Sequence, residues 1–416
     1  MSNLSRRRFV KTAAKGTAAA AAFTALSRSR ILGANDRISI GLIGCGDRGI
    51  EVHLKTIHKY DAQQNVQFTA VCDPWRLRRE QAAELIKEWY GIKAPQFASH
   101  EDLLAYKNVD AVMIASCDHA HARQLEAAAK AGKDAYCEKP LARNMDELNR
   151  AFDAVKKAGI IVQVGTQLRS VPGVVGAHEV YKTGILGKVT RIEQVRNDDQ
   201  PFWYRYVKEA KEEDVDWKQF LMGQPMRPFN AVQFTGWYGF RDFCDGLVPQ
   251  WGSHFIDTVH YITGAKFPAS CVAQSGIFRW KDEYGFTCGD QVHAVWVYPE
   301  GFMVSYTTNF GNEFGNLTRI YGDQGLLKLD NVMAPVLTAE GGFKNRGVIR
   351  GVNPVQPIER PDHFLDWLQC LRSRKTPHAP IEAGYQHSVA CIMAVESHDK
   401  GIRAVYDPVA RQIKQG

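Results

Sequence analysis

The sequence has little that is typical of a membrane-embedded or nucleic-acid-binding protein. After the first 30 residues, no apolar stretch approaches the roughly 20 residues that a membrane-spanning helix needs. The formal net charge is +7, but residues 1–30 carry seven Lys and Arg and no acidic residue, so the rest of the chain is neutral. A neutral body has no net field to attract polyanions. We therefore expect neither a nucleic-acid partner nor stable membrane insertion.

Cysteine-based sites are also missing from the sequence. The chain has nine cysteines but no C-x-x-C pair, and no cluster of residues has the spacing of metal ligands. Cys45, Cys72, Cys117 and Cys137 lie in or beside apolar runs, which favours buried thiols. An oxidising compartment would allow some pairing, and the odd total leaves at least one cysteine free or paired outside the chain.

Length and composition indicate a globular protein of two domains. A chain of 416 residues exceeds the roughly 100–200 residues of one typical domain. Hydrophobic residues make up 45% and charged residues 23%, which is ordinary for a globular protein with a large core.

The N-terminal segment has the pattern of an export signal. Ser5-Arg6-Arg7-Arg8-Phe9-Val10-Lys11 resembles the twin-arginine signal of bacteria, and a short Ala-rich stretch follows it. Ala25-Leu26-Ser27 offers small residues for a peptidase. The alternative is a frayed basic tail. We predict a signal peptide and N-terminal arm over residues 1–34, recognition by the twin-arginine export machinery, and a periplasmic or otherwise exported protein.

Residues 35–165 alternate short β-like runs with helical segments, which predicts a doubly wound parallel sheet. The strand candidates are Ile38–Ile43, Val66–Cys72, Val109–Ala115, Ala135–Cys137 and Ile160–Val164. The helix candidates are Gly49–Lys59, Arg76–Tyr90, Glu101–Tyr106, His119–Ala131 and Met145–Ala158.

Residues 166–416 predict a second, α+β domain with a large, mainly antiparallel sheet, because tight turns join several strands in sequence. Its strand candidates are Val189–Val195, Cys271–Trp280, Val292–Tyr298, Phe302–Phe310, Leu317–Tyr321 and Leu326–Leu329. Segment 198–250 is rich in aromatic residues, Gly and Pro and has little periodicity, which is typical of binding loops. Segments 361–372 and 384–401 look helical and are assigned to this domain.

A nucleotide-binding motif follows the first predicted strand. Gly44-Cys45-Gly46-Asp47-Arg48-Gly49 has the G-x-G-x-x-G pattern, and Asp73 ends the next strand. In this context the glycines allow a tight turn, backbone approach of a pyrophosphate and close helix packing, and the acid accepts hydrogen bonds from ribose hydroxyls. Asp73 would repel a 2′-phosphate, so NAD is favoured over NADP. Arg76 and Arg78 lie close by and weaken that preference.

Glu138-Lys139-Pro140 follows a predicted parallel strand, at the edge of the sheet where ligands bind in such folds. A lysine there can hydrogen-bond a substrate hydroxyl as it loses its proton. An exposed turn lysine is the alternative interpretation of Lys139 taken alone.

These motifs together resemble the glucose–fructose oxidoreductase / inositol dehydrogenase / rhizopine-catabolism (Gfo/Idh/MocA) family. The resemblance also rests on Asp118-His119-Ala120-His121 and on the segment from Gly246 to Asp257, and it runs from about residue 36 to the C-terminus. It implies a Rossmann domain, an open-faced sheet domain, and hydride transfer between NAD(P) and a sugar, polyol or related carbonyl compound. It also implies that Lys139 is the catalytic lysine and His254 the acid/base histidine.

Further site residues are predicted around this centre. The cofactor set is the glycine motif, Gly44 to Gly49, with Asp73, Ser116, His119, His121, Glu138 and Lys139. Gln167, Arg169, Tyr238 and Asp257 are expected to contact substrate. Trp203, Tyr204 and Trp237 could stack on a sugar ring like Tyr238, or belong to the core. His119 and His121 could cap a helix instead, and His254 taken alone could be a structural histidine. A homodimer or homotetramer is expected.

Gln250 departs from the family pattern, in which many members carry Asp four residues before the histidine. A carboxylate one helical turn away would raise the pKa of His254, and an amide cannot carry that charge. We therefore expect a neutral His254 at pH 7, count Gln250 among the catalytic residues, and consider Asp257 as a substitute acid.

The export prediction bears on the reaction. The twin-arginine route carries folded proteins, and free NAD is scarce outside the cytoplasm, so we expect the cofactor to be tightly held. The favoured function is an NAD(H)-dependent oxidoreductase acting on a sugar, glycoside or polyol. One alternative is a redox-neutral glycosidase, lyase or epimerase that works through a transient ketosugar. A second is a non-catalytic sugar-binding protein on the same fold.

Overall fold

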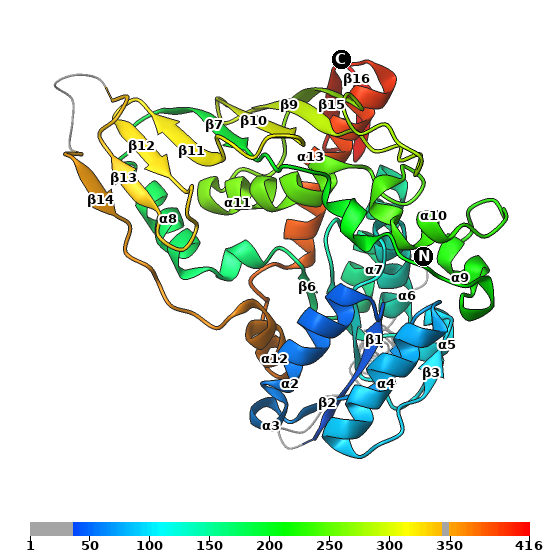
Figure 1. Cartoon of the computed structure of the whole chain (residues 1–416). Helices are drawn as coiled ribbons and strands as arrows, with labels where there is room; N and C mark the ends of the chain where they lie inside the picture. The colour runs from blue at the N-terminus through cyan, green and yellow to red at the C-terminus, as the bar shows by residue number, and fades with distance from the viewer. Residues whose placement is uncertain (1–35, 343–348) are drawn as a thin grey trace, which may run out of the picture.

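The computed structural model describes residues 36–342 and 349–416. The proposed export signal lies outside the described residues. Figure 1 shows two sheets at opposite ends of the molecule, with helices α11 and α13 between them. Both predicted sheets are therefore present, one of six strands in the N-terminal part and one of ten strands in the C-terminal part.

The N-terminal domain is a Rossmann fold. All its strand pairs are parallel, and the strand order is β3-β2-β1-β4-β5-β6. The strands are β1 Ile38–Ile43, β2 Val66–Cys72, β3 Gln96–Phe97, β4 Ala111–Ile114, β5 Asp134–Cys137 and β6 Val162–Val164. The helices are η1 Arg48–Leu54, which is π-helical, α2 Lys55–His58, α3 Asp61–Gln64, α4 Arg76–Tyr90, α5 His100–Ala105, α6 Asp118–Lys130 and α7 Met145–Ala158.

Local sequence explains where these helices begin and end. The Asn144 side chain accepts from the N–H of Glu147 at 2.9 Å and caps the start of α7. Gly159 ends the same helix in the left-handed conformation that glycine adopts without a Cβ clash. Strands β1 and β4 are almost wholly buried, as expected for a parallel sheet covered on both faces.

The second domain is built on a sheet with the order β14-β13-β12-β11-β7-β10-β9-β8-β15-β16. Its pairs are antiparallel except for β7 with β10, which confirms the prediction of a mainly antiparallel sheet. The strands are β7 Val189–Val195, β8 Ser270–Gly276, β9 Gln291–Tyr298, β10 Phe302–Asn309, β11 Leu317–Gly322, β12 Gly325–Lys328, β13 Val336–Thr338, β14 Val352–Pro354, β15 Ala404–Asp407 and β16 Gln412–Gln415.

Strand β8 is shorter than the sequence predicts. The expected strand ran from Cys271 to Trp280, but β8 ends at Gly276. The Asp290 carboxylate accepts the backbone N–H groups of Phe278, Arg279 and Trp280 at 2.8–3.1 Å. Because the Asp290 side chain accepts these N–H groups, they do not pair with a neighbouring strand, and residues 278–280 leave the sheet.

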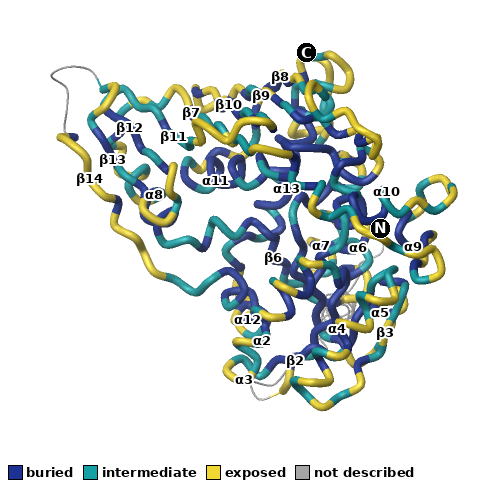
Figure 2. The backbone as a smooth tube through the Cα atoms, viewed as in Figure 1, coloured by how far each residue is buried: buried dark blue, intermediate teal, exposed yellow. Residues whose placement is uncertain are grey.

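One face of the large sheet is covered by helices and the other is open. Helices α8 Pro172–Lys182 and α11 Ser253–Thr263 lie on the covered side, preceded by the short helix η2 Gln167–Ser170. Buried residues line α11 and α13 Ile381–Lys400 in Figure 2. In β9 every second residue is buried and the intervening ones are more exposed, as in a sheet solvated on one side. The exposed apolar residues Val272, Val297 and Met303 lie on these strands.

The last helices link the two domains. Helix α12, His363–Ser373, places Phe364, Trp367 and Leu368 in the same apolar core as β1 and β2. Helix α12, which the sequence assigns to the second domain with the other C-terminal helix, packs against the Rossmann core. Helix α13 contacts both α7 and α11, so it joins the two halves of the molecule.

The irregular segment 198–250 contains only short helices. These are η3 Phe202–Tyr206, η4 Glu212–Asp214, α9 Trp217–Leu221, α10 Ala231–Thr235 and η5 Trp237–Gly239, and η6 Val248–Gly252 is a π-helical turn that leads into α11. All nine cysteines lie within the described residues, and none forms a disulfide. Within residues 36–342 and 349–416, no helix combines the length and apolarity needed to cross a bilayer.

Candidate active site

The glycine turn between β1 and η1 has the geometry that a dinucleotide requires. Gly44 has φ +92°, and a Cβ there would lie 2.5 Å from the Ala115 carbonyl carbon. A Cβ on Gly49 would collide with the Gly44 carbonyl oxygen. A Cβ on Gly46 would meet no atom within 4 Å, so this position faces open space in the cleft. Only Gly46 therefore leaves room for a ligand to approach the main chain.

Asp73 fixes the turn and retains capacity for a ligand. Its Oδ2 accepts from the Cys45 N–H at 2.6 Å, and its Oδ1 accepts from the Trp75 N–H at 2.8 Å. A carboxylate has about four acceptor positions, so two remain for ribose hydroxyls. Asp73 lines the cleft, whereas the Cys45 side chain is fully buried and contributes only its backbone.

The nearby arginines are already paired. Arg78 bonds Asp47 at 2.7 Å, and Arg76 bonds Glu80 at 2.8 Å and Asp214 at 2.5 Å. These carboxylates already offset part of both guanidinium charges, which weakens their attraction for a 2′-phosphate and favours NAD.

Glu138 joins the glycine turn to the turn that carries Lys139. Its Oε1 accepts from Arg48 at 2.6 Å, from His53 at 2.9 Å and from Gln167 at 3.3 Å. Burial alone would favour the neutral acid, but Arg48 and His53 outweigh it and hold the pKa of Glu138 well below its usual range. Gln167 also donates to the Tyr136 hydroxyl at 2.8 Å, so the predicted substrate residue Gln167 is held at the cleft wall.

Lys139 is bound to Gln250 from the other domain. Its Nζ donates to the Gln250 backbone carbonyl at 2.8 Å and to the Gln250 Oε1 at 3.2 Å. The Gln250 Nε2 donates in turn to Asp118, at the start of α6. Burial lowers the pKa of Lys139, although Asp118 and Glu138 oppose this effect. The Gln250 side chain therefore faces Lys139 and Asp118, and no side-chain hydrogen bond joins it to His254 among the described residues.

His254 lies in the first turn of α11 and lines the same cleft. Burial, followed by the Lys139 charge, lowers its pKa to about 3, so the imidazole is neutral at pH 7. Its Nδ1 is buried and has no hydrogen-bond partner among the described residues. A neutral ring with an unused nitrogen can accept a proton.

The remaining predicted cofactor residues build the wall of the cleft. Ser116 donates to the Gln124 side chain at 2.5 Å, and the His121 ring lies 2.9 Å from the Ser116 carbonyl and 2.8 Å from the Pro140 carbonyl. His119 contacts the Phe220 carbonyl at 2.7 Å. Burial lowers the pKa of both histidines, and both side chains are engaged with the backbone around the cleft.

One cleft of about 650 Å³ contains the glycine turn, Asp73, Lys139, Gln250 and His254. Aromatic residues form part of the cleft wall. Tyr238 stacks on Trp237 at 3.7 Å between ring centres, and Phe202 stacks on Trp251 at 5.3 Å. A pocket with an apolar wall and a few converging polar groups is typical of a small-molecule site.

Comparison with known proteins agrees with this site. Residues 38–166 match a family described as "Oxidoreductase family, NAD-binding Rossmann fold", and residues 223–405 match its "C-terminal alpha/beta domain". The chain belongs to the Gfo/Idh/MocA oxidoreductase family. Its N-terminal part is an NAD-binding Rossmann domain.

The individual relatives match this chain only in part or at low sequence identity. The chain is 31% identical over 188 residues to an inositol 2-dehydrogenase/D-chiro-inositol 3-dehydrogenase of Lactiplantibacillus plantarum, covering 44% of this chain and 52% of the relative. The chain thus spans about half the length of the curated relatives that it matches. Among solved structures, an aldose–aldose oxidoreductase from Caulobacter crescentus, complexed with glycerol, superimposes with a TM-score of 0.67 at 18% identity, covering 89% of this chain and 100% of that one. The WlbA dehydrogenase of Bordetella pertussis, in complex with NADH and UDP-GlcNAcA, gives 0.65 at 19% identity, with 89% and 99% covered.

Two predicted substrate residues of this Gfo/Idh/MocA protein do not line the cleft. Arg169 bonds Asp257 at 2.8 Å, and Asp257 is fully buried beside His387. Burial would raise the pKa of Asp257, but Arg169 and His387 outweigh it and hold this pKa far below its usual range. The structure therefore corrects the expectation that these two side chains face the substrate. Asp257 has its charge neutralised behind the cleft, so it is a poor substitute acid for His254.

Sequence reasoning also missed residues that the fold brings to the site. Phe202 and Trp251 line the cleft, and Trp237 lines it as anticipated, whereas Trp203 is buried and Tyr204 lies outside the lining. Asp118 was noted only as part of a family stretch. The acidic residue at a helix start could have drawn attention to it, but its partner Gln250 is 132 residues away.

Proposed function

We propose that the protein is an NAD(H)-dependent oxidoreductase that acts on a sugar, glycoside or polyol. The proposal is carried by one observation: Lys139 and a neutral His254 converge in the cleft that also contains the glycine turn and Asp73. Gly44, Gly46, Gly49 and Asp73 would hold NAD, and bound NAD supplies the acceptor or donor of the hydride.

Lys139 orients and polarises the reacting hydroxyl. Its ammonium has three donors, and the contacts to Gln250 use two acceptors from one residue, which leaves a donor for substrate. A buried positive charge beside a hydroxyl favours its ionised form, so Lys139 stabilises the oxygen as the proton leaves.

His254 takes the proton. The low pKa keeps the ring neutral over the physiological range, and a neutral imidazole has one nitrogen that can accept a proton. The buried Nδ1 has no hydrogen-bond partner among the described residues, so no protein contact competes for it. In the reverse direction the same ring returns the proton to a carbonyl oxygen.

The aromatic side of the cleft suits the apolar faces of a sugar or polyol ring. Tyr238, Trp237, Phe202 and Trp251 are held against one another, so the surface is formed in advance of binding. The inositol dehydrogenase relatives and the aldose–aldose oxidoreductase support a substrate of this class.

The test is a panel of aldoses, inositols and anhydrosugars incubated with the purified protein and NAD. We expect at least one to produce reduced nicotinamide, detected by its absorbance, and the His254→Ala variant to lose that signal. Native mass spectrometry of the same sample should detect NAD and its loss on denaturation. Wild-type protein that binds NAD yet turns over no member of the panel would count against this substrate class. Absence of nucleotide affinity would reject the oxidoreductase assignment altogether.

We also propose that the chain is exported by the twin-arginine route, from Arg6-Arg7 and the Ala-rich stretch after them. A fusion of residues 1–34 to a reporter should be exported, and the Arg6→Lys/Arg7→Lys variant should remain in the cytoplasm. Normal export of the double variant would show that the arginine pair is not the signal.

A further inference from the structure

The Gln250 side chain connects the Lys139 ammonium to a buried carboxylate on a third element. Its Oε1 accepts from Lys139, and its Nε2 donates to the Asp118 Oδ2. Lys139 follows β5, Asp118 opens α6 and Gln250 lies in η6. Because the amide offers one donor end and one acceptor end, each end meets a partner of complementary polarity.

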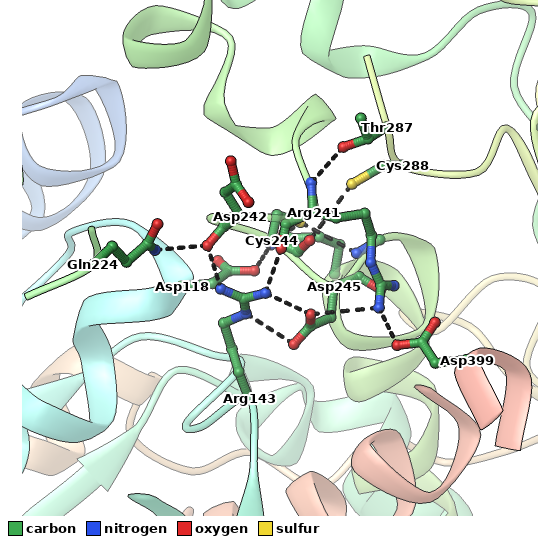
Figure 3. Close-up of polar contacts among 12 residues, drawn as sticks. Asp118, Arg143, Gln224, Arg241, Asp242, Cys244, Asp245, Thr287, Cys288 and Asp399 are labelled. Atoms are coloured by element: carbon green, nitrogen blue, oxygen red, sulfur yellow. Dashed lines mark hydrogen bonds and ion pairs between the residues drawn. The ribbon is translucent and has the colours of Figure 1, made fainter. Parts of the chain in front are cut away.

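Within the part of the chain that the structure describes, Asp118 has no cation in direct contact. It is only 3% exposed, and no Lys, Arg or His of the described residues lies within ion-pair distance of its carboxylate. Figure 3 shows it beside Cys244 and near Arg143, whose guanidinium is already bound by Asp245 at 2.7 and 2.9 Å and by two backbone carbonyls. Burial raises the pKa of Asp118 to about 7, against the influence of Lys139 and Arg143.

Such burial is costly, because a carboxyl group without a direct counter-ion is unstable in an apolar environment. The Gln250 Nε2 is the one amide donor to its Oδ2 among the described contacts, and that amide leads directly to Lys139. The Asp118 charge therefore acts on Lys139 across the intervening Gln250 amide rather than across solvent.

We propose that Asp118 is a positioning residue of the reaction site, which acts through the Gln250 amide to hold Lys139 protonated and directed into the cleft. The negative charge that position 250 lacks is thus supplied from the start of α6. The importance of Lys139 for turnover rests on the proposed function, whereas the link between the three side chains does not.

An alternative role is purely structural, in which the Asp118–Gln250 bond only fastens the two domains together. The positioning role depends on the charge of the side chain at position 118, whereas the structural role depends only on its shape. Asn has the shape of Asp, and Glu has the shape of Gln, so exchanging the charge between the two positions separates the roles. The variants are Asp118→Asn, Gln250→Glu and the double exchange Asp118→Asn/Gln250→Glu. Glu147→Gln, which removes the charge of a surface partner of Arg123, is the matched control.

The first readout is the pH dependence of Lys139 acetylation by acetic anhydride, measured by mass spectrometry on the NAD-bound protein. The neutral amine reacts, so the midpoint follows the lysine pKa. The exposed Lys130 serves as internal reference. The charged or titratable groups that face Lys139 are Asp118, Glu138, Arg48, His121, Cys244, His254 and Cys391. Those that face Asp118 are Cys117, Lys139, Arg143, Tyr238, Cys244 and Asp245.

Asp118→Asn should move the Lys139 midpoint to lower pH by about 1 pH unit or more, the effect of removing one opposite charge at close range. Gln250→Glu should move it to higher pH, because this substitution places a carboxylate in direct contact with the ammonium. The double exchange should return it close to the wild-type value, since one amide and one carboxylate again occupy the two positions. The control should leave it unchanged.

The second readout is kcat with the best sugar or polyol of the panel. Asp118→Asn should lower kcat about tenfold with little change in NAD affinity. Gln250→Glu alone should also lower kcat, and the double exchange should recover most of that loss. An unchanged Lys139 midpoint in both single variants would overturn the proposal, and so would a double exchange no better than the worse single variant. If Asp118→Asn does not fold, the comparison of Gln250→Glu with the double exchange decides. Failure of every sugar would reject the proposed function, while the acetylation result would still stand.

Discussion

The two walls of the cleft are built in different ways. The nucleotide wall relies on the main chain of the contiguous turn 44–49, tied to Asp73 only 28 residues later. The reaction wall relies on side chains from separate elements, since Lys139 and Gln250 are 111 residues apart and Gln250 and Asp118 are 132 apart. The first wall forms when one strand–helix unit folds, whereas the second exists only after both domains pack together. Damage to each wall should therefore have its own signature.

The largest effect is expected on the reaction wall. Lys139→Ala or His254→Ala should lower kcat by at least ~100-fold, the lower range for one acid–base group, because each removes a proton-handling group from the cleft. NAD affinity, measured by titration, should remain within the wild-type range. Lys130→Ala, an exposed lysine on α6, is the control and should behave like wild type. Normal turnover in both cleft variants would place the chemistry elsewhere.

Behind the reaction wall, Asp257→Asn should destabilise the fold by about 3–5 kcal/mol, because it leaves the half-buried Arg169 without its counter-charge. The pKa of Asp257 is lower in the folded protein, so its contribution is present above the unfolded value of about 3.9 and is lost as pH falls through the folded value. Urea unfolding of wild type and variant should therefore converge under strongly acidic conditions. Asp153→Asn, at the surface pair with Arg411, should cost less than about 1 kcal/mol. Equal losses in the two variants would contradict the contrast.

On the nucleotide wall, Gly46→Val should weaken NAD binding by roughly 10- to 100-fold, since a side chain enters the space left for the cofactor and such overpacking costs about 1–3 kcal/mol. Gly46→Ala should have an intermediate effect. Thermal unfolding of the cofactor-free protein should be unchanged, because no protein atom lies within 4 Å of the added Cβ. Retained affinity in Gly46→Val would mean that the cofactor does not approach this turn.

The last prediction concerns Asp118, whose folded pKa of about 7 lies above the unfolded value of about 3.9. The folded form then binds more protons, so wild-type stability from this group falls as pH rises from about 4 to 7. Asp118→Asn does not titrate there. The melting temperature of the variant relative to wild type should rise across this interval and level off above it. If the melting temperatures of wild type and variant change with pH in parallel over this interval, the ionisation of Asp118 carries no cost in stability.

Prediction from sequence worked best where a pattern is local. Strands β1 and β2 match their predicted bounds, because a buried parallel strand between turn residues is a continuous apolar run. Strand β8 was overextended, since nothing near Phe278 shows that Asp290 takes its N–H group. The packing of α12 against the Rossmann core was not predicted for a similar reason, because an amphipathic helix does not show which apolar surface it covers.

For this protein, the sequence by itself determined the Rossmann motif, the two-domain order and the residue types available for acid–base chemistry, because each depends on short-range spacing. Only the tertiary structure decided how those residues are used. It paired Asp257 with Arg169 behind the cleft, left His254 neutral with an unpartnered nitrogen among the described residues, and joined Lys139 through Gln250 to Asp118. The physical reason is that burial and charge pairing depend on which side chains meet in space, and here the partners come from segments about a hundred residues apart.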